Sequence, residues 1–469
     1  MMYAHAPLLL DLLGPVPPER GDAPAVIDGD AVAGPCVVYT QSSLRAAVAA
    51  AAAAWPAPAR SVAVFAVRWS PAFVVAYFAA HAAGQAVCLV DPGRPWQDIA
   101  TRLGAEVVVS DAEDGAGNGP VAGLNVTVGA ARPPVHPDLA LLLPTSGSTG
   151  SARLVRLTGQ GLKVNTADII QALGITADDC AVGHLSPWYS YGLSVLHSHL
   201  MAGGGIVVTR RGLLDAGFWD MVRQAKATTL PGVPFHYQTL RRFDLDRLDL
   251  PALRTMTQAG GRLDARLVKH FADLMAARGG RFFVMYGQTE AAPRIAVHAP
   301  EDVAVRPASV GRPLAHVDVT VEDPDGRVLA PTEVGQVVVR GPNVMMGYAT
   351  ERADLERGDE MGGVLRTGDR GFLDADGVLT LVGREARFAK MFGLRLDLEA
   401  IERAIEAPSV VVEKGDRLII LTEGDAAAAR VAAIALTGLT PAVVVGRSVE
   451  SLPRLPNGKI DLRGAEALA

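Results

Sequence analysis

Short runs rich in Val, Ile and Leu alternate with Ala-rich stretches through most of the chain. Ser61–Val67, Ala86–Val90 and Ala105–Ser110 have the length and composition of strands, and Pro71–Ala83 that of a helix between them. Short apolar runs bounded by turn residues are typical of strands buried on both faces. Their alternation with helices predicts parallel βαβ units and an α/β fold.

From about Val317 onward the pattern changes to short strands joined by tight turns. Val317–Val321, Gly335–Arg340 and Gly377–Val382 are such strands, with Asp/Gly turns such as Asp323–Gly326 between them. This spacing predicts a mostly antiparallel β region. A last short unit of mixed type follows, with these elements: a helix over Leu398–Ile405, strands at Val410–Val412 and Arg417–Thr422, and a helix near Ala426–Leu436.

The composition is that of a globular enzyme and excludes several classes. Of 469 residues, 49% are apolar and 20% charged, and the net charge of −6 gives no reason to expect nucleic acid as a partner. The cysteines Cys36, Cys88 and Cys180 lie far apart, so neither a disulfide framework nor a zinc site is predicted.

No membrane span and no signal peptide are expected. Pro71–Val90 is the most membrane-like stretch, but it contains His81, Gly84 and Gln85, which favours a buried helix followed by a buried strand. The first residues lack the basic region of a signal peptide. We therefore expect a cytoplasmic protein.

A loop of small hydroxyl residues and glycines follows an apolar strand at Leu141–Pro144. The residues of this loop are Thr145, Ser146, Gly147, Ser148, Thr149 and Gly150. Glycines let backbone N–H groups face an anion, and hydroxyls add donors, so nucleotide phosphates are natural guests. The loop is not a Walker A sequence, and the basic Arg153 and Arg156 follow it. Taken alone, it is equally consistent with a flexible linker.

Three later segments carry further polar groups suited to nucleotide chemistry. A predicted strand delivers Tyr286–Glu290, where Tyr286 can stack on a purine, Thr289 can donate to a phosphate and Glu290 can bind Mg²⁺. Asp369 lies in a predicted turn suited to ribose hydroxyls, and Lys459 on a tight turn near the C-terminus. Separately, a packed tyrosine, ordinary turns and a solvated lysine explain them equally well.

Taken together and in this order, the motifs resemble the acyl-adenylate-forming superfamily, the AMP-dependent synthetases and ligases. Its members include acyl-CoA synthetases, peptide-synthetase adenylation domains and luciferases. The matching stretches span nearly the whole chain: Thr145–Gly150, Gly260 with Gly261, Tyr286–Glu290, Thr367–Asp369, Gly383 and Arg384 with Lys390, Gly393 and Arg395, and Pro456–Lys459.

The resemblance implies a two-domain α/β architecture. A large N-terminal domain over residues 1–384 would combine mixed sheets flanked by helices with a β-rich subdomain. A hinge at residues 385–386 would join it to a small, mobile α+β domain over residues 387–469.

The resemblance also implies roles for individual residues. Thr145–Gly150 would embrace the ATP phosphates, while Gly260, Gly261, Tyr286 and Gly287 would border the adenine. Thr289 would bind phosphate, Glu290 Mg²⁺, Asp369 the ribose, and Arg384 would lie near the ribose at the hinge. Lys459 would bridge carboxylate and phosphate during adenylation. Lys390, Gly393 and Arg395 would serve the second half-reaction, with CoA as the expected acceptor.

Four departures from the family pattern stand out. Arg153 replaces the lysine that usually follows the phosphate loop, and Ala386 occupies the hinge position that is usually Asp or Lys. Ser190 stands where acyl- and aryl-CoA synthetases often have a histidine. The C-terminal unit is also shorter than usual, which puts the acceptor in doubt.

The stretch around Ser190 also bears on the substrate. The predicted acid pocket consists of Trp188, Tyr189, Ser190, Tyr191, Val233, Phe235 and Gln258. No aspartate lies between Pro187 and Leu193 to pair with an α-amine, which disfavours amino acids. Apolar and aromatic walls favour an aryl or medium-sized acyl acid, although the same residues are also suited to the core.

Three functions stay open from the sequence. The leading hypothesis is an acid–CoA ligase, and the alternative is an adenylating ligase that transfers the acyl group to a carrier protein or an amine. A non-catalytic adenylate-binding relative would have lost Glu290, Asp369 or Lys459, and all three are present.

Overall fold

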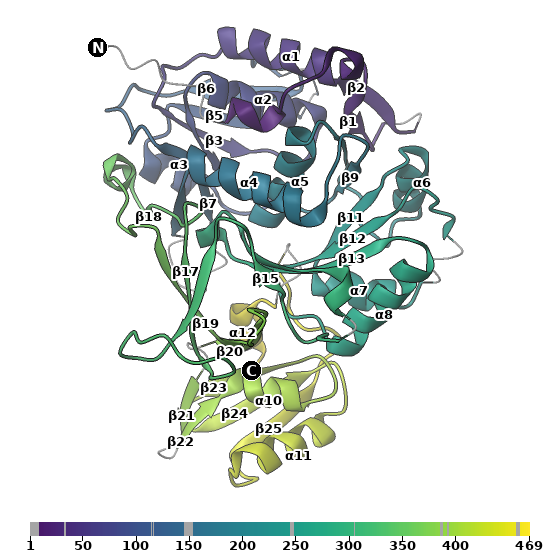
Figure 1. The fold of residues 1–469 in the computed structure, drawn as a ribbon. Coiled ribbons are helices and arrows are strands. Elements are labelled where there is room, and N and C mark those ends of the chain that lie inside the picture. The colour runs from purple at the N-terminus through teal and green to yellow at the C-terminus, as the bar shows by residue number, and fades with distance from the viewer. Residues whose placement is uncertain are drawn as a thin grey trace. The chain divides into compact units, whose positions relative to one another are not determined.

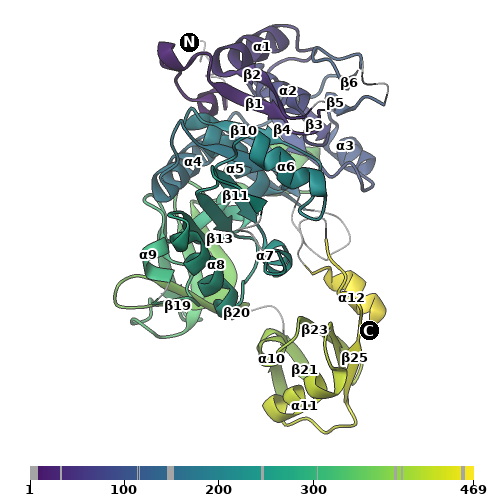
Figure 2. The ribbon, with the colours of Figure 1, turned by 90° about the vertical axis from the view of Figure 1, so that its right-hand side faces the viewer.

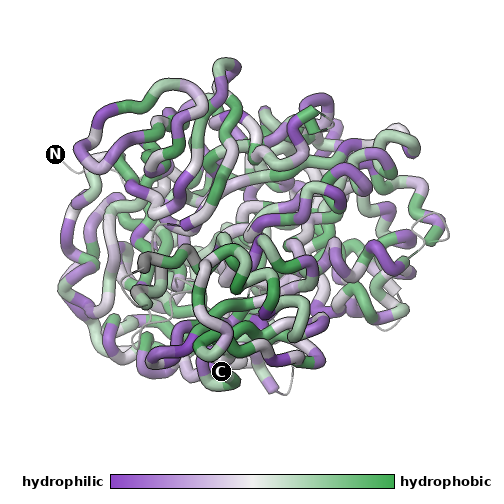
Figure 3. The backbone as a smooth tube through the Cα atoms, turned by 90° about the horizontal axis from the view of Figure 1, so that it is seen from below, coloured by the Kyte–Doolittle hydropathy of each residue, from purple (hydrophilic) through white to green (hydrophobic). Residues whose placement is uncertain are grey.

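The computed structural model describes residues 9–31, 34–113, 115, 117–144, 153–243, 248–303, 305–384, 388–391, 394–455 and 460–469. The chain folds as two compact units, Met1–Val319 with Val339–Leu365, and Thr320–Val338 with Arg366–Ala469. The hinge predicted at residues 385–386 lies outside the described residues. Hydrophobic and hydrophilic segments alternate along the described parts of the chain (Figure 3).

The first unit contains a sheet of seven described strands in the order β18-β8-β7-β4-β3-β5-β6. The strands are β3 (Val62–Ala66), β4 (Ala86–Leu89), β5 (Val107–Asp111), β6 (Leu124–Val128), β7 (Leu139–Pro144), β8 (Leu154–Thr158) and β18 (Gly347–Ala349). β3 pairs in parallel with both β4 and β5, and every residue of β3 and β4 is buried. The prediction of parallel, doubly covered strands is therefore confirmed.

A sheet of nine described strands has the order β15-β14-β13-β12-β11-β9-β10-β1-β2. The strands are β1 (Pro24–Asp28), β2 (Cys36–Thr40), β9 (Cys180–Gly183), β10 (Gly205–Val208), β11 (Thr229–Gly232), β12 (Thr255–Gln258), β13 (Arg281–Gly287), β14 (Arg294–His298) and β15 (Arg312–Pro313). The central strands from β1 to β13 run parallel, while β2, β14 and β15 pair antiparallel at the two edges.

Helices of the first unit pack on and between its two sheets (Figure 1). They are α1 (Gln41–Ala53), α2 (Pro71–Ala82), α3 (Gln97–Leu103), α4 (Gly159–Leu173), α5 (Ser190–Met201), α6 (Ala216–Gln224), α7 (Pro234–Leu240), α8 (Ala265–Ala277) and α9 (Pro300–Val303). α2 contacts β4 of one sheet and β1 of the other, and α4 contacts β7 and β14. A helix covered by sheets on both sides is apolar all round, which explains the membrane-like composition of α2.

Local capping fixes where α2 begins. The Ser70 hydroxyl accepts from the backbone N–H of Phe73 at 3.1 Å, and Pro71 occupies the first turn, where its missing N–H costs no hydrogen bond. Within the described ranges, the structure contains no helix with both the length and the apolar character that a membrane span requires.

The second unit contains smaller sheets and three helices among its described residues (Figure 2). Their bounds are β16 (Asp318–Glu322), β17 (Gly335–Arg340), β19 (Val364–Leu373), β20 (Leu379–Arg384), β21 (Phe388–Met391), β22 (Leu394–Asp397), β23 (Ser409–Lys414), β24 (Arg417–Thr422), β25 (Val444–Ser448), α10 (Leu398–Ala404), α11 (Ala426–Thr437) and α12 (Leu462–Leu468). β19 and β20 pair antiparallel, as the turn spacing predicts.

Strand alternation gives the C-terminal sheet two apolar faces. Val411 and Ile420 pack into one cluster with α10 and α11, while Val410 and Leu421 pack into another with Ala465 of α12. Because successive strand residues point to opposite faces, both faces of β23 and β24 are covered by helices.

Candidate functional site

The end of β13 presents the first group of predicted site residues. β13 runs through Tyr286 to Gly287, and a short 3₁₀ turn, Thr289–Ala291, follows directly. A Cβ atom on Gly287 would lie 1.9 Å from the carbonyl oxygen of Pro293, so only glycine lets the chain pass there. Glycine therefore allows Thr289 and Glu290 to follow immediately at the carboxyl edge of the sheet, where α/β folds bind ligands.

The Glu290 carboxylate is held by a tyrosine from a distant part of the sequence. Tyr348 donates its hydroxyl proton to Glu290 Oε1 at 3.0 Å, and the Arg153 guanidinium lies 4.6 Å from the centre of the Tyr348 ring. Burial, and then the adjacent carboxylate, raises the pKa of Tyr348 to about 12, so the phenol stays a donor. Among the described residues, Glu290 Oε2 has no hydrogen-bond partner, which leaves one oxygen for a cation.

Ser190 joins this group from the first residue of α5. Its hydroxyl lies 3.2 Å from the Thr289 hydroxyl, so the start of α5 and the end of β13 are linked directly. Ser190 is almost fully buried. The structure thus brings together Ser190, Thr289 and Glu290, which the sequence analysis assigned to the acid pocket, the phosphates and Mg²⁺.

The two tyrosines beside Ser190 occupy different positions. Tyr191 donates to the carbonyl oxygen of Thr257 at 2.9 Å, so its hydroxyl is used within the fold. The Tyr189 hydroxyl would lie 2.2 Å from a Cβ atom on Gly260, whose φ of +87° also favours glycine. Tyr189, Val233 and Gly260 therefore lie against one another.

The remaining predicted pocket residues are less closely grouped. Gln258 donates to the Gly261 carbonyl at 2.8 Å and supports that loop, while Trp188 is partly buried. Phe235, on α7, is 37% exposed.

Arg294, the first residue of β14, was missed by the sequence analysis. Its side chain is only 2% exposed, and its guanidinium carbon lies 4.9 Å from the centre of the Tyr191 ring. The available signal was a lone arginine opening the apolar strand that follows Tyr286–Glu290. Tyr348 had no comparable signal, because it reaches Glu290 from 58 positions along the chain.

Asp369 and Arg384 of the second unit are register partners on β19 and β20. Arg384 Nε donates to Asp369 Oδ1 at 2.8 Å, and the Thr367 hydroxyl accepts from the backbone N–H of Asp369 at 3.0 Å. The Asp369 side chain is buried while that of Arg384 is exposed. These residues, both predicted to lie near the ribose, form one ion pair.

Comparison with known proteins decides the family. Residues 17–349 match the family described as AMP-binding enzyme. This chain belongs to the AMP-binding enzyme family. The match covers the two large sheets and the β13–Glu290 turn.

Individual relatives agree with this assignment. The chain is 32% identical to a feruloyl-CoA synthase of an Amycolatopsis species over 248 residues, 53% of this chain and 50% of that protein. It thus spans about half the length of the curated relatives it matches.

Solved structures show the same fold over nearly the whole chain. The O-succinylbenzoate coenzyme A synthetase of Bacillus subtilis with AMP has a TM-score of 0.73 and 20% identity, with 96% of each chain covered. The amide bond synthetase McbA of Marinactinospora thermotolerans has a TM-score of 0.75 and 22% identity, with 98% of each covered. The α/β fold with a large mixed-sheet part and a small α+β part is therefore confirmed. The Bacillus subtilis enzyme has also been solved with ATP and a magnesium ion.

Some of the predicted site residues lie outside the described residues, namely Thr145–Gly150 of the phosphate loop, Gly393 of the second half-reaction and the catalytic Lys459. Lys390 and Arg395 are direct register partners on β21 and β22. Their roles and those of the other site residues stay predictions.

The donor set fits a magnesium ion carried by a nucleotide. In the described parts of the chain, no cluster of three or more His, Cys, Asp or Glu side chains could hold a metal by itself. Mg²⁺ bound to phosphates needs only one or two protein carboxylates, and Glu290 supplies one whose Oε2 has no hydrogen-bond partner among the described residues.

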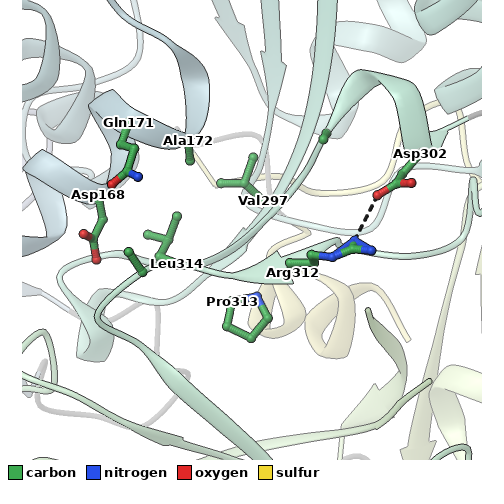
Figure 4. A pocket seen from close by; sticks show the side chains of 10 residues that line it. Asp168, Gln171, Ala172, Val297, Asp302, Arg312, Pro313 and Leu314 are labelled. Atoms are coloured by element: carbon green, nitrogen blue, oxygen red, sulfur yellow. Dashed lines mark hydrogen bonds and ion pairs between the residues drawn. The ribbon is translucent and has the colours of Figure 1, made fainter. Parts of the chain in front are cut away.

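A separate surface pocket of about 300 Å³ lies between α4 and β14–β15 (Figure 4). Its acids already have partners, because Asp302 accepts from Arg312 at 3.0 Å and Asp168 lies 2.7 Å from His316 Nδ1. Both acids are therefore already bonded within the protein, so we place no reaction there.

Proposed function

We propose that the protein activates a carboxylic acid with ATP to an acyl-adenylate and then transfers the acyl group to CoA. The observation that carries the proposal is the group of Ser190, Thr289 and Glu290 at the end of β13, in a chain of the AMP-binding enzyme family. Feruloyl-CoA synthase and 2-succinylbenzoate–CoA ligase, named among its relatives, are acid–CoA ligases, which supports CoA as the acceptor.

In the first step, the acid's carboxylate oxygen attacks the α-phosphorus of ATP, and the bond to pyrophosphate breaks. Both reactants are anions, so cationic groups must offset their repulsion. Mg²⁺ held by the phosphates and Glu290 would supply part of that charge. On the family resemblance, Lys459 would supply more, and Thr289 would donate to the phosphate.

In the second step, a thiolate attacks the acyl carbon and AMP leaves. No protein nucleophile is needed, because the acyl group is already activated as a mixed anhydride. The residues around Ser190 hold the acid without an acidic side chain among Trp188–Tyr191, so the substrate we propose is not an α-amino acid.

Product analysis tests this proposal. Protein, ATP, Mg²⁺ and a panel of aryl, acyl and amino acids are incubated with and without CoA, and AMP and thioester are measured by mass spectrometry. We expect AMP and a thioester that forms only when CoA is added. AMP with a hydroxylamine-trappable acyl group but no thioester would move the acceptor to a carrier protein or an amine.

Two variants identify the machinery. Glu290→Gln removes the charge for Mg²⁺ and keeps a hydrogen-bond acceptor for Tyr348, so we expect lost AMP formation in a folded protein. Lys459→Ala should do the same. Arg312→Gln, in the separate pocket, is the matched control and should leave AMP formation unchanged.

A further inference from the structure

Arg294 is a buried cation that no carboxylate among the described residues pairs with. Its side chain is 2% exposed, and its Nε atom has no hydrogen-bond partner. Within the described parts of the chain, its guanidinium forms neither an ion pair nor a hydrogen bond, and its central carbon lies over the face of the Tyr191 ring. Burying an unpaired charge costs several kcal/mol, so an anion bound to this guanidinium would stabilise the protein.

The neighbouring groups do not supply the missing charge. Burial raises the pKa of Tyr191 to about 12 and raises that of Tyr189 as well, so both phenols are neutral. The contact with the Tyr191 ring offsets only part of the cost of burial. Guanidinium does not lose its proton in proteins, so the charge stays.

The backbone of Arg294 is nonetheless held firmly. Its N–H donates to Asn165 Oδ1 at 3.0 Å, and its carbonyl accepts from Asn165 Nδ2 at 2.7 Å and from Asn343 Nδ2 at 3.3 Å. Asn165 and Asn343 are themselves buried. The fold therefore fixes this residue while leaving its charged end unmet, which is the arrangement of a preorganised ligand-binding group.

Its position places that charge beside the predicted acid pocket. Arg294 on β14 pairs in register with Gly287 on β13, and Gly287 lies two residues before Thr289. The Arg294 guanidinium also stacks on the ring of Tyr191, which follows Ser190 in the sequence. Ser190 and Thr289 are in turn hydrogen-bonded to each other. The guanidinium thus belongs to the wall that Tyr189 and Tyr191 form, rather than to the Glu290–Tyr348 pair.

We propose that Arg294 recognises a second anionic group on the acid, so that the substrate is a dicarboxylic acid activated at one end. This inference rests on the proposed function and narrows its substrate class. On the family resemblance, Lys459 is the cation at the reacting carboxylate, so Arg294 would instead bind a distant carboxylate, where it contributes binding and orientation. The second carboxylate would pair with the guanidinium through charge-assisted hydrogen bonds.

Matched acid pairs test the substrate class in the unmodified protein. Glutaric acid is compared with pentanoic acid, and a phenyl-substituted diacid with its monoacid, by acid-dependent exchange of pyrophosphate into ATP. We expect kcat/KM to be at least about tenfold higher for the diacids, as one charge-assisted hydrogen bond predicts. Equal rates, or a preference for the monoacids, would overturn the inference and leave the proposed function standing.

Variants then test the residue. Arg294→Met should raise KM for the diacid about 10- to 100-fold and leave or improve exchange with the monoacid. Arg294→Lys, which keeps the charge, should recover part of the diacid activity. Arg312→Met, an ion-paired surface arginine, is the control and should change neither.

Three other results would count against the inference. Equal loss for mono- and diacids in folded Arg294→Met would assign the residue to the nucleotide or to the reacting carboxylate. Unchanged diacid preference in that variant would mean that Arg294 does not touch the acid. If none of the acids supports pyrophosphate exchange in the unmodified protein, the proposed function is overturned together with this inference. If both Arg294 variants fail to fold, the comparison of matched diacids and monoacids in the unmodified protein still decides whether the substrate is a dicarboxylic acid.

Discussion

Two buried arginines of the first unit, Arg156 and Arg294, differ in the hydrogen-bond and ion-pair partners of their guanidinium groups. Arg156, on β8, donates to the carbonyl oxygen of Arg357 at 2.6 Å and of Met346 at 3.2 Å, and forms an ion pair with Glu360. Arg294, on β14, has no such partners in the described parts of the chain. The sequence analysis assigned a role to neither, although Arg156 follows the predicted phosphate loop. Arg156 thus supports the fold, whereas Arg294 is the residue for which we propose a role in ligand binding.

The comparison shows why burial alone does not indicate function. A buried charge whose hydrogen bonds are met within the protein supports the fold, and removing it leaves its partners unsatisfied. A buried charge that is unmet lowers stability unless something else binds it. The predictions below use substitutions that separate these two cases.

The largest effect is expected at Arg156. Arg156→Met leaves the Arg357 and Met346 carbonyls without their donor, so the free energy of unfolding should fall by about 3 kcal/mol. Urea denaturation measures this loss. A loss no larger than that of the exposed control Arg312→Met would contradict the structural role of Arg156.

A buried histidine extends the comparison to a group that can lose its charge. Burial, and then the nearby His197, lowers the pKa of His81 from 6.5 to about 3. Between pH 6.5 and 3 the unfolded chain therefore binds a proton at His81 that the folded chain does not. The free energy of unfolding is thus unaffected by His81 above pH 6.5 and falls as the pH drops below it.

Between pH 7 and pH 5, the free energy of unfolding should fall by about 2 kcal/mol less in His81→Phe than in the unmodified protein. Urea denaturation at both pH values measures the difference, and the exposed His270→Gln serves as the control. An identical pH dependence in His81→Phe and the unmodified protein would show that His81 is not held neutral by the fold.

A substitution at Tyr348 tests how the hydrogen bond to Glu290 orients its carboxylate. Tyr348→Phe removes the 3.0 Å hydrogen bond that orients the carboxylate. We expect acid-dependent AMP formation to slow about tenfold, which corresponds to about 1.4 kcal/mol in the activation barrier. Wild-type rates in Tyr348→Phe at limiting Mg²⁺ would mean that this tyrosine does not position Glu290.

The smallest effect, and the one opposite in sign, is expected for the stability of Arg294→Met. Replacing an unpaired buried cation with an apolar side chain of similar length should raise the free energy of unfolding by about 1 kcal/mol. A loss as large as that of Arg156→Met would show that the charge of Arg294 is met within the protein after all.

Much of the fold follows from local sequence pattern. The strand at β3, the helix at α2 and the strand delivering Tyr286–Glu290 all lie within a residue or two of their predicted bounds. These elements are marked by apolar runs and by turn residues such as Ser70 and Pro71, which act over a few positions. Local signals of this kind need no knowledge of the rest of the molecule.

The contacts that define the site were less predictable. Tyr348 meets Glu290, and Arg294 stacks on Tyr191, only because strands distant in sequence are brought together by the sheets. The placement of α2 between two sheets was equally hidden, since an apolar helix indicates burial but not what covers it. Whether a buried arginine is paired depends on such long-range contacts, so the difference between Arg156 and Arg294 could not be read from the sequence.

Acid-dependent exchange of radioactive pyrophosphate into ATP tests the account most directly. The exchange requires reversible formation of an acyl-adenylate, and it does not depend on the identity of the acceptor. We predict exchange that needs both Mg²⁺ and an added acid, is strongest with dicarboxylic acids, and is lost in Glu290→Gln. Absence of exchange with every acid, in protein that binds ATP, would contradict the proposal that this chain activates carboxylic acids.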